Sequence, residues 1–284
     1  MNAATSAATS ALAACRRIWG LMYRHIALYR RSWPRLLELA YWPSLQMCIW
    51  GFTASFFASR ISPTATGTVA GAAMATLGAL LGGVLLWEVA LRSQMGVAIT
   101  FLEEIWSRNL GHVFVSPLRP WELVAALMGM SVLRMAAGVL PAVLLAWLLY
   151  AFDLFALGPV LILFTINLVV MGWWVSLGVV SLILRHGAGA EALAWSVLFG
   201  LTPFSAVFYP VAALPAAIQP ISLALPSAHV FEGMRAALLT GTIRWDHLAW
   251  AGGLNLLWMA AAGWLFARQF RVARLRGALL SIGE

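Results

Sequence analysis

Two adjacent carboxylates, Glu103 and Glu104, are the side chains in this sequence that most resemble a general acid–base pair. No nucleophile, metal-ligand set or oxyanion-donor set surrounds them in the sequence. The five histidines fall near predicted helix ends or in loops, and the two cysteines are too few for a zinc site or a disulfide framework. There is no phosphate-binding loop and no HExxH or GxSxG motif. We therefore expect no catalytic residue, no bound metal and no cofactor in this chain.

The composition indicates where these side chains must sit. Of the 284 residues, 62% are apolar and only 10% are charged, against about 45–50% and about 25% in soluble domains. This excludes a soluble enzyme and a disordered chain, and predicts a polytopic, all-α integral membrane protein. All 18 basic residues are arginine, opposed by ten carboxylates, for a net charge of +8. Because the arginines cluster between apolar runs, they indicate membrane topology rather than nucleic-acid binding.

Six stretches are apolar over about the 20 residues that a spanning helix needs. They are about Leu36–Ala58, within Thr66–Phe101, within Trp121–Ala151, about Gly158–Leu184, about Ala190–Tyr209 and about His247–Ala267. Arginine clusters precede the first span and follow the sixth, which predicts that both termini are cytoplasmic. The connection between the fifth and sixth spans is an exception, because Arg235 and Arg244 would lie outside.

The segments flanking this six-helix domain, residues 36–268, differ in character. We expect a disordered tail over residues 1–14, an amphipathic interface helix over residues 15–35 and a basic cytoplasmic tail over residues 269–284. At 100° per residue, one sector of the interface helix is apolar and Arg17, Arg24 and Arg31 fall opposite, toward lipid phosphates. The helix either is a plain basic anchor or also contacts a cytoplasmic partner, and both interpretations stay open.

Three internal features suggest function. Glu88 and Arg92, four residues apart in the second span, form either a structural ion pair or part of a translocation path. Residues 101–113 are the most polar internal stretch, and their mixture of Trp, Leu, Glu and Arg predicts a short amphipathic helix that docks on another protein. Residues 203–240 are too apolar for a solvated loop and too rich in proline for one span, which predicts re-entrant helices on the external face.

Two of these regions carry a family resemblance. Glu103-Glu104 followed by Ser116-Pro117-Leu118 resembles the E-E…S-P-[LV] segment between spans two and three of ABC-2-type ABC transporter permeases. The second region resembles the family's F-S-x-x-F-[FY]-P…L-P…N-P…H…R pattern, with Leu225 in place of the usual Asn; its matching residues are Phe204–Pro210, Leu214-Pro215, Pro226, His229 and Arg235. Both patterns occur in the family's order, so the chain is similar to the membrane subunits of bacterial ABC exporters.

The resemblance implies a partner protein and a set of functional residues. Two permease copies, identical or different, would pair in the bacterial inner membrane with two separate ATPase subunits, which bind the ATP and Mg²⁺. The family's coupling helix and interface helix would meet the ATPase through Glu103, Glu104, Trp106, Arg108, Asn109, Arg17, Arg24 and Arg31. Spans one, two and five tend to line the path in this family, which indicates Trp42, Gln46, Glu88, Arg92, Trp195 and Phe199. The external re-entrant region would include Phe208, Pro210, Pro215, Pro226, His229 and Arg235.

The function predicted on this basis is ATP-driven export of an amphipathic or lipid-linked substrate, such as a lipid, glycolipid, polysaccharide or drug. The alternative is a secondary transporter or channel without an ATPase partner. Secondary transporters often contain two similar halves, and residues 36–150 and 158–268 show no convincing repeat. The many tryptophans suit either cargo stacking or ordinary contact with the lipid interface.

Overall fold

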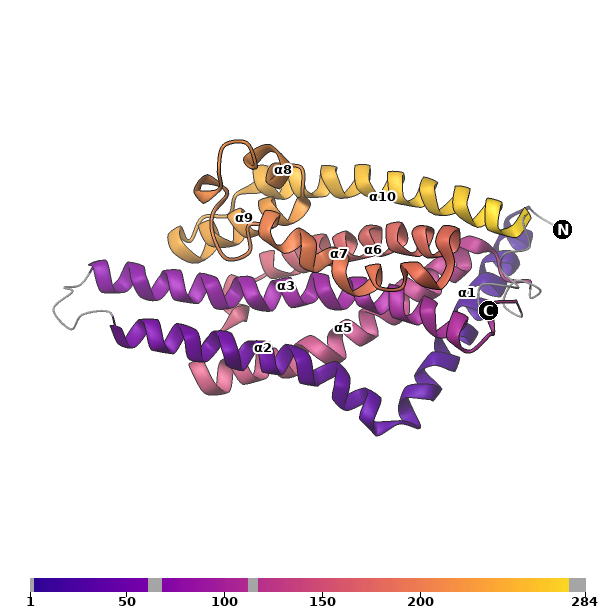
Figure 1. The fold of residues 1–284 in the computed structure, drawn as a ribbon, viewed down its shortest axis with the longest axis horizontal. Coiled ribbons are helices and arrows are strands. Elements are labelled where there is room, and N and C mark those ends of the chain that lie inside the picture. Colours follow the sequence, from indigo (N-terminus) through magenta and orange to yellow (C-terminus); the bar gives the residue numbers. More distant parts are fainter. Residues whose placement is uncertain (1–2, 61–67, 112–116, 276–284) are drawn as a thin grey trace.

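The computed structural model describes residues 3–60, 68–111 and 117–275, and within these residues every regular element is a helix or a 3₁₀ turn. The long helices run roughly along one axis of an elongated molecule (Figure 1). The α-helices are α1 (Ala3–Arg30), α2 (Trp33–Arg60), α3 (Thr68–Trp106), α5 (Pro120–Tyr150), α6 (Val160–His186), α7 (Leu193–Leu201), α8 (Gln219–Leu223), α9 (Pro226–Thr240) and α10 (Trp245–Leu275). Short 3₁₀ turns are η1 (Leu154–Leu157), η2 (Gly187–Ala190), η3 (Thr202–Phe204) and η4 (Val211–Ala213).

Four helices are long and apolar enough to cross a membrane. They are Thr76–Trp106 within α3, together with α5, α6 and α10. The first predicted span lies in α2, whose 28 residues suffice in length but whose composition does not reach that of the four, because Tyr, Trp, Gln, Ser and Pro interrupt its apolar run. The all-helical membrane fold expected from the composition is therefore confirmed for the described residues.

The fifth predicted span, about Ala190–Tyr209, has a different structure from the one expected. Its helix α7 has nine residues, and with η3 the apolar helical stretch reaches only Leu193–Phe204. At 1.5 Å per residue this covers about 18 Å, well short of the roughly 30 Å hydrocarbon core. Pro203 and Pro210 each lack a backbone N–H, so the α-helix does not continue through them.

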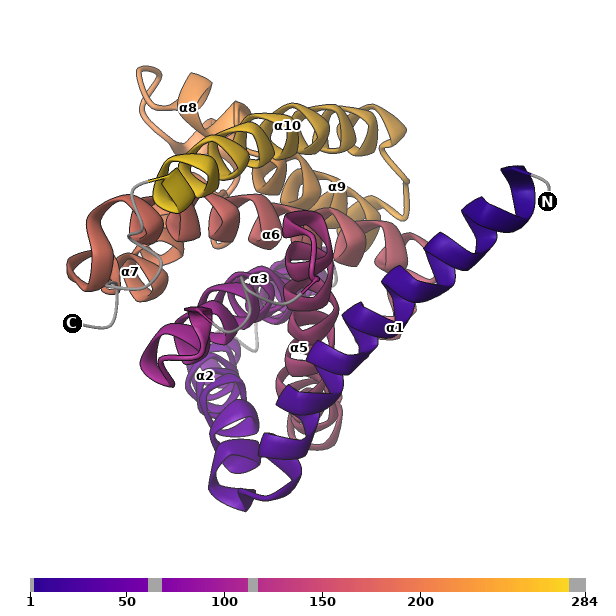
Figure 2. The same cartoon turned by 90° about the vertical axis from the view of Figure 1, so that its right-hand side faces the viewer.

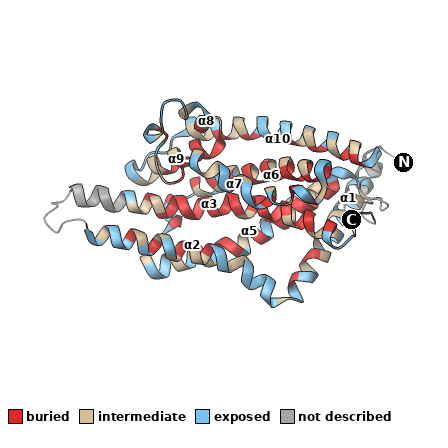
Figure 3. Cartoon of the chain, in the orientation of Figure 1, coloured by how far each residue is buried: buried red, intermediate tan, exposed pale blue. Residues whose placement is uncertain are grey.

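Helix α3 forms the centre of the bundle. It packs against α2, α5, α6, α7 and α9, and 72% of its most apolar window is buried, against 17% for α10. Buried residues accordingly concentrate along α3 in Figure 3. Glycines allow the close approach of its neighbours: a Cβ on Gly172 of α6 would lie 2.8 Å from the Ala90 carbonyl oxygen, and one on Gly96 would lie 2.6 Å from the Ser131 Cβ of α5.

Helix α1 lies across one end of the bundle, over α5 and the start of α2 (Figure 2). We call this the α1 end of the molecule. The prediction of a disordered tail over residues 1–14 is wrong from Ala3 onward, because α1 begins there. Seven of residues 3–14 are alanine, the residue with the strongest helix propensity. At the other terminus α10 continues to Leu275, so the first part of the predicted basic tail is helical; residues 276–284 lie outside the described residues.

The predicted coupling helix at residues 101–113 does not begin as a separate element. Helix α3 runs unbroken to Trp106, and a turn at residues 107–109 follows, with Arg108 in the left-handed region at φ 52°. The helix therefore carries Glu103 and Glu104 in its last turn. Residues 112–116, which complete the predicted segment, lie outside the described residues. At the opposite end of the molecule, residues 203–240 form η3, η4, α8 and α9 in place of a single span.

Candidate functional site

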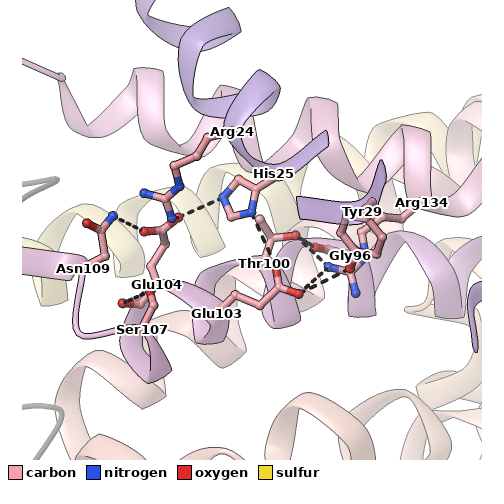
Figure 4. Close-up of polar contacts among 10 residues, drawn as sticks. All are labelled: Arg24, His25, Tyr29, Gly96, Thr100, Glu103, Glu104, Ser107, Asn109 and Arg134. Carbon is pink, nitrogen blue, oxygen red and sulfur yellow. Dashed lines mark hydrogen bonds and ion pairs between the residues drawn. The ribbon is translucent and has the colours of Figure 1, made fainter. Parts of the chain in front are cut away.

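A cluster of charged and polar side chains fastens α1 to α3 and α5, and Figure 4 draws its members other than Arg17 and Glu122. We call this cluster the α1 joint, and its members are Arg17, Arg24, His25, Tyr29, Glu103, Glu104, Glu122 and Arg134. The four α1 residues recur at spacings of seven, one and four, which places them on neighbouring strips of one helix face. The carboxylates lie in the last turn of α3 and the first turn of α5, where both helices meet α1.

Glu104 lies at the centre of the α1 joint and is completely buried. Its carboxylate accepts hydrogen bonds from an Arg24 Nη2 and, at 2.7 Å, from the Asn109 Nδ2. The His25 Nε2 lies 2.9 Å from the same carboxylate, and His25 is itself only 1% exposed. Charge-assisted contacts from three directions offset the desolvation of this carboxylate, because a buried charge without partners is strongly unfavourable.

Glu103 extends the joint toward α5. Its carboxylate accepts a hydrogen bond from the Tyr29 hydroxyl at 3.3 Å and lies 3.7 Å from the Arg134 Nη1. Arg134, buried in α5, also donates to the Thr100 hydroxyl at 3.1 Å, and its guanidinium lies 5.1 Å from the centre of the Tyr29 ring. The part of the joint around Glu103 and Glu104 therefore connects three helices through one continuous set of polar contacts.

A second anchor ties the earlier part of α1 to α5. Arg17 donates from its Nε and Nη2 to the two carboxylate oxygens of Glu122, at 2.9 and 2.6 Å. Glu122 is fully buried and also accepts a hydrogen bond from the backbone N–H of Arg119, at 2.9 Å, which caps the start of α5. This bidentate geometry makes the pair directional as well as attractive.

The charges of the joint alter the titration of the α1 side chains. Burial lowers the pKa of His25, but contacts with Glu103 and Glu104 outweigh it, so the pKa of His25 is raised above its ordinary value. Burial also raises the pKa of Tyr29 to about 12. His25 therefore keeps its proton to a higher pH than a free histidine would, and Tyr29 remains a hydrogen-bond donor throughout the physiological range.

The joint changes the interpretation of several predicted interface residues. The expectation that Arg17 and Arg24 point toward lipid phosphates is wrong, because both pair with carboxylates of this chain. Glu103, Glu104 and Asn109 face inward with them. Arg31 is exposed and follows the last residue of α1. Trp106 and Arg108 are also exposed, although the Trp106 Nε1 donates to a carboxylate oxygen of Glu191, at 2.9 Å, beside the start of α7.

The predicted path residues are only partly brought together. Trp42, Arg92 and Trp195 line a single cavity of about 350 Å³ near the α1 end. Glu88 does not line it, but its carboxylate accepts a hydrogen bond from the Arg92 Nε at 3.0 Å. Gln46 and Phe199 lie outside the cavity lining, and Phe199 is 53% exposed.

The predicted external residues organise the opposite end of the molecule. The Glu232 carboxylate accepts hydrogen bonds from the Val211 N–H at 2.7 Å and from the Arg235 Nη2 at 3.1 Å. Arg235 also donates to the Ala206 carbonyl oxygen, at 2.9 Å. The other predicted residues are placed as follows: Phe208 stacks on Trp50, Pro210 precedes η4, Pro215 follows it, Pro226 starts α9, and the Nδ1 of His229 lies 3.2 Å from the Nδ1 of His247.

The amino-acid sequence before α9 departs from the family pattern at Leu225. This residue is the N-cap of α9, with an extended backbone and no side-chain hydrogen bond to the first turn. An asparagine at an N-cap accepts hydrogen bonds from the first free N–H groups of a helix. Leucine lacks that acceptor, and here it is buried instead.

Sequence reasoning missed four members of the joint. They are His25, Tyr29, Glu122 and Arg134. A signal existed for Glu122, because Arg119-Pro120 followed by an acidic residue is typical of a helix start. Arg134 stood as a lone charge in an apolar span, which is itself a reason to expect a partner. Nothing in the sequence pairs His25 with two carboxylates about 80 positions away.

The fold and the joint define an all-helical membrane protein with a surface helix fastened to its central helix. Residues 16–239 match the family model described as "ABC-2 type transporter". The chain therefore belongs to the ABC-2 transporter family, whose members are permeases that normally pair with an ATPase subunit. No curated protein matches the chain. The family match begins within α1 and ends within α9, so it includes both the α1 joint and the external helices.

Proposed function

We propose that this chain is the permease subunit of an ABC exporter, driven by ATP hydrolysis on a separate subunit. The observation that carries this proposal is the α1 joint, which links a surface helix to the central helix α3 through buried polar contacts. A force applied at the α1 end would move both elements together, since each is held to the other by buried charge-assisted contacts. A permease that receives work from a partner needs such a mechanical connection.

The arginines support a cytoplasmic location for the α1 end, and with it cytoplasmic termini. This end carries most of the exposed arginines of the described residues, including those at the end of α10. Arg235 and Arg244, which conflicted with the topology, are each paired with a carboxylate at the opposite end, Glu232 and Asp246. Pairing reduces their net charge, which makes an external location less costly. We propose a six-span layout in the bacterial inner membrane, in which α2 is the first span and α7, which is too short to cross alone, forms a broken fifth crossing together with η3 and η4.

The contact with the ATPase would be made by exposed side chains next to the joint rather than by the joint itself. Trp106 is 53% exposed at the end of α3, and Arg108 follows it in the turn. Trp19 and Tyr23 form an exposed aromatic strip on α1, on the side away from the joint. Two such permeases and two ATPase subunits would assemble, with ATP and Mg²⁺ held by the ATPases, and the cargo would be amphipathic or lipid-linked.

Co-purification tests this proposal directly. Tagged full-length protein, extracted from its native membrane in mild detergent, should retain an ATPase subunit with vanadate-sensitive turnover. Trp106→Ala should reduce recovery of that subunit, while Trp121→Ala, which removes a tryptophan of similar exposure (51%) from the start of α5, should not. A chain that purifies without any nucleotide-hydrolysing partner would overturn the proposal and favour a secondary transporter or channel.

A further inference from the structure

One cavity combines arginine side chains, aromatic walls and a position at the α1 end. Its volume is about 350 Å³, and five helices line it: Tyr29 of α1, the first turns of α2, the second half of α3, Arg134 of α5 and Trp195 of α7. Part of its wall is apolar and comes from Leu39, Met95 and Ile99. The joint forms its inner wall through Tyr29, Glu103 and Arg134.

Three guanidinium groups line this cavity, against two carboxylates. Arg92 uses its Nε for Glu88, and among the described residues neither of its terminal nitrogens has a hydrogen-bond partner. Arg134 is 7% exposed and uses one terminal nitrogen for Thr100 and Glu103. Arg35 is exposed on the first turns of α2. Donors on the buried Arg134, the part-buried Arg92 and the exposed Arg35 therefore remain available to a group that enters the cavity.

The two carboxylates do not cancel these donors. The Glu103 Oε1 accepts a hydrogen bond from Tyr29 and lies near Arg134, and its Oε2 lies 3.4 Å from the His25 Nδ1 without a hydrogen-bond partner. Glu38 is exposed on α2, three residues after Arg35. Even with the Glu103 Oε2 and the Glu38 carboxylate counted as free acceptors, the free donor nitrogens of the three arginines are more numerous, which matches a ligand with several anionic acceptor oxygens. Arginine is the side chain best suited to phosphate, because its planar fork can bind two oxygens at once.

Large aromatic side chains border the same cavity. Trp42 and Trp195 line it and are 52% and 45% exposed. They come from α2 and α7, the two helices that the proposed layout adds to the four apolar spans. An amphiphile could lie with its apolar part against these rings while its head reaches Arg92 and Arg134. Basic pockets between membrane helices at the cytoplasmic side are known to suit anionic lipid heads.

We propose that this cavity binds the phosphate-bearing head of an amphiphilic molecule at the cytoplasmic side, as the entry site for the substrate. The proposal rests on the permease function inferred above. It gives Arg92 and Arg134 the role of head-group ligands, Arg35 that of a cation at the edge of the site, and Trp42 and Trp195 that of contacts for the apolar part. A free phosphate ion shares the recognised chemistry but lacks the apolar part.

Calorimetric titration of the full-length protein in mild detergent tests this assignment, with three probes. Dihexanoyl phosphatidic acid should bind saturably, dihexanoyl phosphatidylcholine should bind more weakly, and inorganic phosphate should also bind more weakly. The paired substitution Glu88→Gln and Arg92→Gln avoids leaving a buried carboxylate alone, and it should weaken phosphatidic acid binding by about tenfold or more. Arg35→Gln, at an exposed position, should weaken it less, and Arg185→Gln, at an exposed position outside the cavity, should leave it unchanged.

Each opposite result overturns a defined part of the proposal. Equal affinity for phosphatidylcholine and phosphatidic acid would show that the cavity does not discriminate between ligands by head-group charge. Equal affinity for inorganic phosphate would show an anion site without an amphiphile. Unchanged phosphatidic acid binding in both the paired variant and Arg35→Gln would show that Arg92 and Arg35 do not contact the head group. If the ATPase partner co-purifies but no lipid binds, the cavity proposal fails alone; if lipid binds but no partner is found, the permease proposal fails instead.

Discussion

The substitution Glu104→Gln tests whether the α1 joint holds the surface helix in place. Glutamine preserves the shape of the side chain and its acceptor oxygen, but it removes the charge that Arg24 and His25 share. A hydrogen bond to a charged group contributes about 1 kcal/mol more than a neutral one, so losing charge assistance on two contacts costs about 2 kcal/mol. Because Arg24 is 39% exposed, solvent screening reduces its share, and we expect a total loss of about 1–2 kcal/mol.

The cost should appear as local opening of α1, because the core helices keep their apolar packing. A loss of about 1–2 kcal/mol corresponds to roughly a 5- to 30-fold increase in the open population. Hydrogen–deuterium exchange of the protein in lipid nanodiscs should therefore show amides of residues 14–30 exchanging about 5- to 30-fold faster. Amides of α9, at the opposite end, should be unchanged.

Glu191→Gln is the matched control, since it removes a carboxylate that contacts the exposed Trp106 at the same end. It should leave exchange in α1 at the level of the unmodified protein. If Glu104→Gln leaves α1 protection unchanged, or if both substitutions raise it equally, the buried carboxylate does not hold α1 and the joint has no special mechanical role.

Three further predictions concern the joint and the packing. Because the pKa of His25 is raised, the stabilisation of α1 by protonated His25 should be complete below about pH 6.5 and should be lost as the pH rises through that raised value. Amide exchange in α1, measured relative to that in α9, should therefore accelerate at alkaline pH. His25→Gln should abolish this pH dependence of α1 exchange. Arg17→Gln leaves the buried Glu122 without its bidentate partner and should lower the thermal unfolding temperature, whereas adding Glu122→Gln should restore part of the loss; no recovery would contradict the pairing. Gly172→Ala places a Cβ 2.8 Å from the Ala90 carbonyl oxygen and should destabilise by about 1–3 kcal/mol, while Gly178→Ala on the same helix meets nothing within 4 Å and should not; equal unfolding temperatures for the two variants would refute the close α3–α6 contact.

Composition and motif order predicted a large part of this protein. The apolar fraction and the length of the apolar runs predicted a helical membrane protein, and the two motif regions predicted its family. These properties follow from the sequence because burial of backbone polar groups in lipid permits few structures other than helices. The i, i+4 spacing of Glu88 and Arg92 also placed them on one helix face, and the structure shows the contact that one of the two open interpretations expected.

The helix boundaries were less predictable. Residues 3–14 were expected to be disordered and are helical, while the fifth expected span contains only a nine-residue α-helix. In both segments two local properties of the sequence favour different structures. Residues 3–14 lack an apolar core, but their alanines favour a helix. The fifth expected span is apolar throughout, but its prolines interrupt the helix. Hydropathy alone does not decide such cases.

The partners of the charged residues were decided only by the tertiary structure. Helical periodicity placed Arg17 and Arg24 on a face opposite the apolar sector, which favoured lipid phosphates, yet both bind buried carboxylates about 80 or more positions away. Periodicity states which residues share a face, but not what that face meets. The same limit applies to the cavity, where residues of five helices converge. The sequence by itself determined a membrane-embedded, all-helical permease; the packing of α1 and α5 around α3 determined which charges are buried together, because only that packing removes them from water.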